Sequence, residues 1–234
     1  MVKLHLKRIN APRTWKIKRQ TNTFIMRPAG SGHKLEHGMP LSVILKEFLG
    51  VAKTSKEVKD IVYNKEVLID GVRRKDLAYH VGLFDVLEIP EIKKSYRIMF
   101  DTRGKLICHE IEAKEKDSKP LKIIAKTMLK KGKIQLNFND GKNKLVEKDN
   151  YKVGDSIVMS LKEQKMIHHY PLEKGAQVYF IGGKYVGQIG TVQSIDQEFV
   201  KFKTENNADA ETVKRYAFVV GKEASCISMP KNKD

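Results

Sequence analysis

Residues 65–77 read KEVLIDGVRRKDL, and the Asp70-Gly71 pair separates two short runs inside this stretch. An Asp-Gly pair between such runs is a strong signal for a two-residue β-hairpin turn, because both turn positions need a positive φ. The stretch therefore predicts a hairpin. Its basic residues are Lys65, Arg73, Arg74 and Lys75.

Two helices are predicted before this hairpin. In residues 40–50, PLSVILKEFLG, the apolar residues fall at i, i+3, i+4, i+7 and i+8, which gives a helix one apolar face. Thr54 and Glu57 have capping-box spacing at the start of a second helix. The run FDVLEI, residues 84–89, predicts a closing strand. Residues 41–90 are therefore expected to form helix, helix, hairpin and strand.

The second helix and the hairpin bring positive charges together. Lys53, Lys56 and Lys59 lie on or before the helix, whose N-terminus also offers backbone N–H groups to a phosphate. Two short basic elements that converge can clamp a nucleic-acid backbone. A solvated charged face is the alternative interpretation.

The first 34 residues contain nine Lys and Arg and no Asp or Glu. Because their apolar residues are few, we expect residues 1–40 to form an extended arm that orders on a partner, although part of it could lie against the protein itself. Trp15 could stack on an unpaired base or pack against the β domain. The basic residues expected to neutralise phosphates are Lys3, Lys7, Arg8, Arg13, Lys16, Lys18, Arg19, Arg27 and Lys34.

The remainder of the chain predicts mainly β-structure. Short runs such as SYRIMFD, KLICHEIEA and DSIVMSL indicate a small central β domain over residues 93–172, in which SKPLKIIAKTMLKKG (118–132) suggests a short helix. Residues 173–228 predict a second β domain, and residues 229–234 form a tail. Together with the arm (1–40) and a helix-helix-hairpin domain (41–92), these domains predict a multi-domain protein of the α+β class that consists mainly of β-structure.

Two segments resemble known RNA-associated modules. Ser55-Lys56, the Val67–Gly71 hairpin and the closing strand resemble an S-four-type RNA-binding domain, although Lys65 and Phe84 stand where that family usually has Gly. The resemblance implies that Ser55, Lys56, Lys59, Arg73 and Arg74 face RNA. The stretch KGAQVYFIGGKYVGQIGTVQSID (174–196) resembles a KOW motif of an SH3-like barrel, which implies that Lys184 and Tyr185 project from its loop.

The order of these modules resembles the archaeal and eukaryotic small-subunit ribosomal protein family S-four-e (eS4). The opening residues His5, Leu6, Lys7, Arg8, Ala11, Pro12 and Trp15 are close to the signature of that family, with only its Gly displaced. The resemblance covers nearly the whole chain. It implies a structural constituent of the small ribosomal subunit, cytoplasmic on the ribosome, that binds small-subunit rRNA and neighbouring ribosomal proteins. The ending without an extension favours an archaeal source.

Composition supports an RNA partner and argues against several other classes. Forty-five basic against 28 acidic residues give a net charge of +17, which favours a polyanion. Two distant cysteines form no CxxC pair, and no apolar run is long enough to span a membrane. GSGHK (30–34) lacks P-loop spacing, and His168-His169 point to opposite faces of a strand.

We therefore expect no enzyme, cofactor, metal site, membrane contact or small-molecule substrate. Cys108-His109 lacks the other members of a nucleophilic site, and Glu110 and Glu112 are expected to pair with Lys105 or Lys114. Two other functions stay open. One is a KOW-containing regulatory factor of transcription or translation, and the other is an accessory protein or enzyme of RNA modification.

Overall fold

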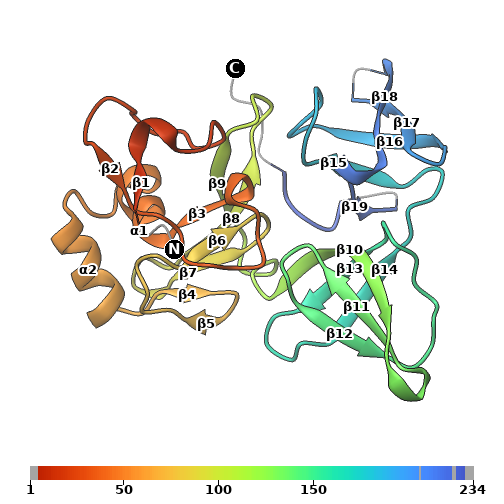
Figure 1. Ribbon diagram of the computed structural model, residues 1–234, viewed down its shortest axis with the longest axis horizontal. Helices are drawn as coiled ribbons and strands as arrows, with labels where there is room; N and C mark the ends of the chain where they lie inside the picture. The colour runs from red at the N-terminus through yellow and green to blue at the C-terminus, as the bar shows by residue number, and fades with distance from the viewer. Residues whose placement is uncertain (1–4, 206, 223–224, 230–234) are drawn as a thin grey trace. The chain divides into compact units, whose positions relative to one another are not determined.

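The computed structural model describes residues 5–205, 207–222 and 225–229, and it is mostly β-structure with few helices (Figure 1). The described chain divides into two compact units. The first takes in the residues up to Met99 and Lys105–Asp117, and the second takes in Phe100–Gly104 and the residues from Ser118 on. Lys3 and residues 230–234 of the tail lie outside the described residues.

The main sheet of the first unit has the strand order β5-β4-β7-β8-β9. Its strands are β4 (Leu68–Ile69), β5 (Val72–Arg73), β7 (Val86–Ile89), β8 (Lys94–Phe100) and β9 (Leu106–Ile111), and a separate pair joins β3 (Gly38–Pro40) to β6 (His80–Gly82). Strand β7 pairs antiparallel with β8, from Val86 opposite Arg97 to Ile89 opposite Lys94. Ladder hydrogen bonds therefore carry this sheet across residue 92, where the sequence analysis placed a domain boundary.

The helical part of this unit keeps the predicted order. The first helix is a short α-turn, α1 (Leu41–Val43), that continues as the π-turn η3 (Ile44–Phe48), and the second is α2 (Ser55–Asn64). The capping box is confirmed, since the Glu57 N–H donates to Thr54 Oγ1 at 3.2 Å while the Glu57 carboxylate accepts from the Thr54 N–H. A short 3-10 turn, η4 (Pro90–Ile92), follows β7.

The hairpin turn is also confirmed. Asp70 has φ 52° and Gly71 has φ 74°, the left-handed values that a two-residue turn demands. Phe84 adopts φ 65° without being glycine, whereas Lys65 has an extended φ of −99° and needs no glycine. The two departures from the S-four-type pattern therefore differ, because only the Phe84 position demands a left-handed backbone.

The N-terminal segment is folded onto the first unit, and not extended as expected. Strand β1 (Leu6–Lys7) pairs antiparallel with β2 (Phe24–Ile25), and the 3-10 turns η1 (Arg8–Asn10) and η2 (Leu35–His37) complete it. Trp15 is 1% exposed, and its indole N–H donates to the Gly38 carbonyl at 2.8 Å. A buried aromatic ring with a satisfied N–H is what fixes this polar segment in place.

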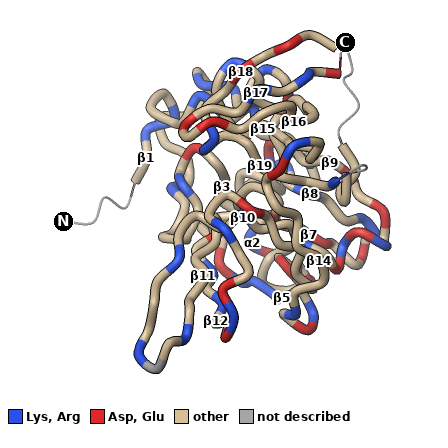
Figure 2. Tube along the Cα trace, turned by 90° about the vertical axis from the view of Figure 1, so that its right-hand side faces the viewer, with Lys and Arg blue, Asp and Glu red and all other residues tan. Residues whose placement is uncertain are grey.

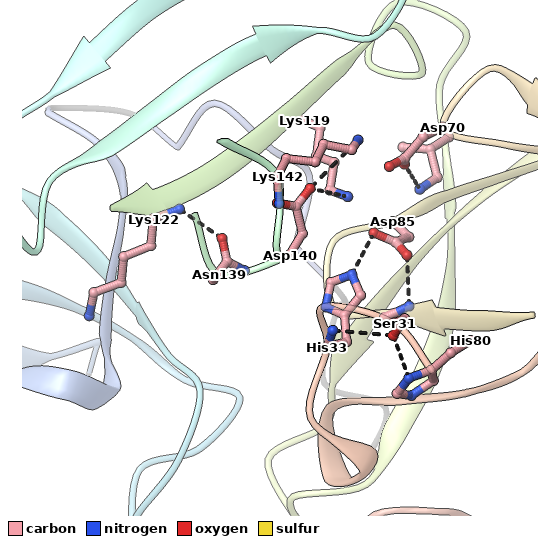
Figure 3. A network of polar contacts seen from close by, with 12 residues as sticks. Ser31, His33, Asp70, His80, Asp85, Lys119, Lys122, Asn139, Asp140 and Lys142 are labelled. Atoms are coloured by element: carbon pink, nitrogen blue, oxygen red, sulfur yellow. Dashed lines mark hydrogen bonds and ion pairs between the residues drawn. The ribbon is translucent and has the colours of Figure 1, made fainter. Parts of the chain in front are cut away.

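Polar contacts hold the other end of this segment (Figure 3). His33 Nε2 lies 3.2 Å from the Asp85 carboxylate, and Asp85 also accepts the Gly82 N–H at 2.7 Å. Ser31 Oγ lies 2.7 Å from His80 Nδ1. Because these side chains come from residues 31–33, from β6 and from the turn between β6 and β7, they tie the segment to the rest of the unit.

The second unit contains two five-stranded antiparallel sheets. The first has the order β12-β11-β10-β13-β14, with β10 (Ser118–Met128), β11 (Ile134–Phe138), β12 (Asn143–Val146), β13 (Ser156–Ser160), β14 (Met166–Tyr170) and the 3-10 turn η5 (Lys130–Gly132). Its core contains Leu121, Ile123, Leu136, Phe138, Ile157 and Met159. The short helix expected at 118–132 is wrong, because pairing with β11 and β13 makes residues 118–128 a long strand.

The second sheet has the order β18-β17-β16-β15-β19. It contains β15 (Gln177–Phe180), β16 (Ile189–Ile195), β17 (Phe199–Thr204), β18 (Asp209–Val213) and β19 (Ala217–Gly221), with the 3-10 turn η6 (Lys214–Tyr216). Gly187 turns the chain at φ 78°, but Gly190 lies inside β16. A Cβ on Gly190 would lie 2.5 Å from the Phe202 ring and 2.8 Å from the Lys203 carbonyl, so this glycine permits close packing and not a turn.

Lys122 connects the two sheets of this unit. Its side chain is 7% exposed, and the Nζ donates to the carbonyls of Lys214 and Arg215 at 3.1 Å and to that of Ala217. Figure 3 also shows its backbone N–H donating to Asn139 Oδ1, and this hydrogen bond fixes the backbone from which the side chain extends. Burial, together with the nearby charge of Lys214, lowers the pKa of Lys122 to about 8.

This lowered pKa predicts a pH dependence of stability. The unfolded chain has a Lys pKa near 10.5 and therefore binds more protons than the folded state between about pH 8 and 10.5. Lys122 should raise the free energy of unfolding by up to about 1.4 kcal/mol per pH unit over that window. Urea midpoints at several pH values, compared with Lys122→Met, measure it. Parallel curves for the two proteins would contradict this assignment.

Candidate nucleic-acid interface

A basic cleft lies between the N-terminal segment and the first helix of the first unit. Its volume is about 850 Å³. The residues that line it are Arg8, Trp15, Lys16, Ile17, Lys18, Arg19, Thr21, Asn22, Lys46, Glu47, Gly50, Ala52, Lys53 and Lys105. Seven of these are Lys or Arg and one is acidic, so the cleft concentrates the positive charge that the composition indicated.

The one acidic residue of the cleft is already paired. The Glu47 carboxylate accepts hydrogen bonds from both terminal guanidinium nitrogens of Arg8. Arg8 also donates to the Lys18 carbonyl at 2.7 Å. Both side chains are largely buried, with 6% and 18% exposed for Arg8 and Glu47. Because this pair is internally neutral, the remaining lysines set the field in the cleft. Arg8, expected to bind phosphate, is instead committed to Glu47.

Arg19 shapes the wall of the cleft. Its guanidinium donates to the carbonyls of Ile9, Ala11 and Pro12 at 2.8–3.0 Å, which holds residues 9–12 in a tight loop. The planar fork of Arg suits such multiple contacts. Arg19 thus positions the segment, while Lys16, Lys18 and Lys53 are exposed at the cleft.

Two lining lysines were missed by the sequence reasoning. Lys46 follows the apolar Leu45 on the short helix, where its position opposite the apolar face was the available signal. Lys105 comes from the turn before β9, and its Nζ donates to the Arg13 carbonyl. No local pattern could have placed Lys105 beside residues more than ninety positions earlier in the chain.

The predicted contacts of helix α2 and the hairpin are partly used within the protein. Arg73 donates to the Tyr63 and Lys65 carbonyls at 3.2 Å. Its positive charge therefore lies at the C-terminal end of α2, where the helix dipole favours a cation. Lys65 pairs with Glu91 at 2.7 Å, and the Arg74 guanidinium lies 4.6 Å from the centre of the Tyr79 ring. Lys56, Lys59 and Lys75 are exposed, as is Ser55.

The N-terminus of helix α2 is not open to a phosphate as expected. The Glu57 carboxylate accepts the Lys53 N–H at 2.8 Å and also contacts the Thr54 backbone and hydroxyl. These hydrogen bonds, led by that from Lys53, lower the pKa of Glu57. A fixed carboxylate at the helix start repels a phosphate and so disfavours the expected phosphate contact there.

The other predicted residues have different surroundings. Trp15 is buried, so its ring is not exposed for the base stacking that was one of its two expected roles. Tyr185 is half-buried, packing edge-on against Phe202 with ring centres 5.2 Å apart, while Lys184 is exposed and lies over it. Lys7, Arg13 and Lys34 are exposed, and Arg27 is half-buried.

The groups that could suggest catalysis have structural partners. Burial raises the pKa of the Cys108 thiol to about 12, which disfavours a nucleophilic thiolate. Ser31 contacts His80, and the Asp85 carboxylate contacts His33. Glu110 pairs with Lys94 at 3.0 Å, which corrects the expected partners Lys105 and Lys114.

His169 Nε2 lies 2.8 Å from Asp155 Oδ2. Over the described ranges, no group of three or more His, Cys, Asp or Glu could hold a metal ion. Within these same residues, no helix is long and apolar enough to cross a membrane.

Comparison with known proteins decides the family. A family model described as "Ribosomal family S4e" matches residues 92–166, and one described as "RS4NT (NUC023) domain" matches residues 2–36. The small ribosomal subunit protein eS4 of Archaeoglobus fulgidus is 40% identical, with 96% of each chain covered. The chain belongs to the eS4 family.

Two further members of the eS4 family support this assignment. The eS4 protein of Methanococcus aeolicus is 36% identical over 96% of this chain and 97% of its own. The crystal structure of the 30S ribosomal protein S4e of Thermoplasma acidophilum matches with a TM-score of 0.70 at 25% identity, covering 80% of this chain and 96% of that one. The match to a solved eS4 structure accords with the mostly β fold described above.

Proposed function

We propose that this eS4-family chain is a structural constituent of the small ribosomal subunit that binds folded rRNA through the basic cleft of its first unit. The observation that supports the cleft as the binding surface is its charge: seven basic residues and one acidic residue, which is already paired with Arg8. Phosphates brought together by folded RNA would be neutralised there, with release of their counterions.

Each unit also has exposed basic residues outside the cleft. Figure 2 shows Lys and Arg recurring along the described chain of both units, interspersed with Asp and Glu. Lys56, Lys59 and Lys75 of the first unit are exposed and available for further phosphate contacts, and Lys184 is exposed in the second. Because such contacts read the RNA backbone and shape, binding needs no reaction and no cofactor. Neighbouring ribosomal proteins are the second class of partner.

The other two functions considered have less support. The relatives from Archaeoglobus fulgidus and Methanococcus aeolicus are named as ribosomal proteins. Each matches 96% of this chain and not the KOW-like segment alone. A transcription factor or an RNA-modifying enzyme would share only one module with this chain.

The assignment to the small subunit is tested by sedimentation. A tagged chain in gently lysed cells of its source should co-sediment with the small subunit and, at low magnesium, stay with that subunit when the two subunits separate. The expected result is near-equal amounts of chain and small-subunit rRNA in those fractions. A chain that stays at the top of the gradient, while small subunits lack it, would contradict the proposal.

A further inference from the structure

A second, smaller cavity lies beside the basic cleft. It has a volume of about 150 Å³, and its walls come from β2, the first helix and α2. Its lining residues are Arg8, Asn22, Phe24, Ile25, Met26, Ser42, Val43, Lys46, Glu47, Ser55, Val58 and Leu77. Arg8, Asn22, Lys46 and Glu47 also line the basic cleft, so the two spaces are neighbours.

The smaller cavity combines apolar walls with an unused polar atom. Phe24, Met26, Val43, Val58 and Leu77 supply apolar surface. The Ser42 hydroxyl is buried and has no hydrogen-bond partner among the described residues. A buried hydroxyl without a partner costs free energy that a ligand able to hydrogen-bond would recover.

Phe24 is unusually placed for a large aromatic side chain. It is 54% exposed, and the His5 ring approaches it edge-on, with ring centres 5.6 Å apart and planes at 83°. In the β1–β2 pair it lies opposite Lys7, which is exposed. An exposed ring beside cations is the arrangement that single-stranded nucleic acids use, with bases stacked on aromatic faces and phosphates on basic residues.

We propose that this cavity binds one unpaired nucleobase of the RNA, stacked on Phe24 and hydrogen-bonded at its edge by the Ser42 hydroxyl. The proposal rests on the proposed function, because a strand held in the basic cleft is what delivers a base to the neighbouring cavity. A base has two apolar faces and a polar edge, which matches apolar walls around a buried hydroxyl. The positive charges of Lys46, which lines both spaces, and of Lys7 favour RNA over an apolar segment of a protein.

The test compares two probes of equal length and charge: a short single-stranded RNA and a ribose-phosphate chain without bases. Binding of the full-length protein is measured by fluorescence anisotropy. Phe24→Ala should weaken the RNA about 10-fold, within the range of base stacking, and leave the abasic chain unchanged. Ser42→Ala should weaken the RNA a few-fold without loss of thermal stability, because the hydroxyl it removes has no partner within the described protein.

Ile9→Ala is the matched control. Ile9 is 72% exposed in the same N-terminal segment but lines neither cavity, so its substitution should change neither affinity. If Phe24→Ala weakens the binding of both probes equally, or of neither, the proposed base pocket is overturned. The cavity would then serve as a contact for an apolar segment of a protein. A wild-type protein that binds neither probe would instead contradict the basic cleft as an RNA-binding surface.

Discussion

Replacing Lys16, Lys18, Lys46 and Lys53 together by Gln is expected to weaken RNA binding by about 10²- to 10³-fold near 0.1 M salt. These lysines line the basic cleft, and none of their side chains contributes to the buried Arg8–Glu47 pair. Each phosphate contact adds about −0.7 to −0.9 to the slope of log affinity against log salt, so the slope should become shallower by about 3. Titrations at several salt concentrations measure both quantities.

The control for this variant keeps the same change of net charge. Lys148, Lys152, Lys174 and Lys222 are exposed lysines of the second unit, and replacing all four by Gln removes equal charge without changing a residue that lines the cleft. If this control weakens binding as much as the cleft variant does, the RNA responds to net charge alone and the cleft has no special role.

The largest expected effect on stability is that of Trp15→Ala. Trp15 is 1% exposed, and its replacement leaves a cavity and the Gly38 carbonyl without its donor. Such substitutions cost about 3–5 kcal/mol, enough to detach the N-terminal segment or unfold the first unit. Trp15→Phe should cost less, since the ring volume is largely kept. Urea unfolding followed by far-ultraviolet circular dichroism measures both, because the variants lack the only tryptophan.

The same variant separates packing from base stacking. If Trp15 acts through the fold, RNA affinity of Trp15→Ala should fall together with the fraction of folded protein, and the folded fraction should bind as wild type does. A variant that keeps wild-type stability while its RNA affinity drops about 10-fold would show that the ring contacts a base after all.

Local signals predicted the first unit well where a few neighbouring residues decide the structure. The Asp70-Gly71 turn and the Thr54–Glu57 capping box are such cases, because their hydrogen bonds and dihedral angles involve residues at most three apart. Residues 118–128 were misassigned because a short apolar run does not distinguish helix from strand, and pairing with β11 and β13 decided it. The pairing of β7 with β8 across residue 92 is likewise a contact between segments that no local pattern indicates.

The sequence alone determined the net charge of +17, the acid-free N-terminal segment and the resemblance to eS4, since these depend only on composition and residue order. Only the tertiary structure decided which basic residues remain available. It buried Trp15 and paired Arg8 with Glu47 across 39 positions, and it brought Lys46 and Lys105 into the basic cleft. The reason is physical: charge is a property of each residue, but burial and pairing depend on contacts between segments far apart in the chain.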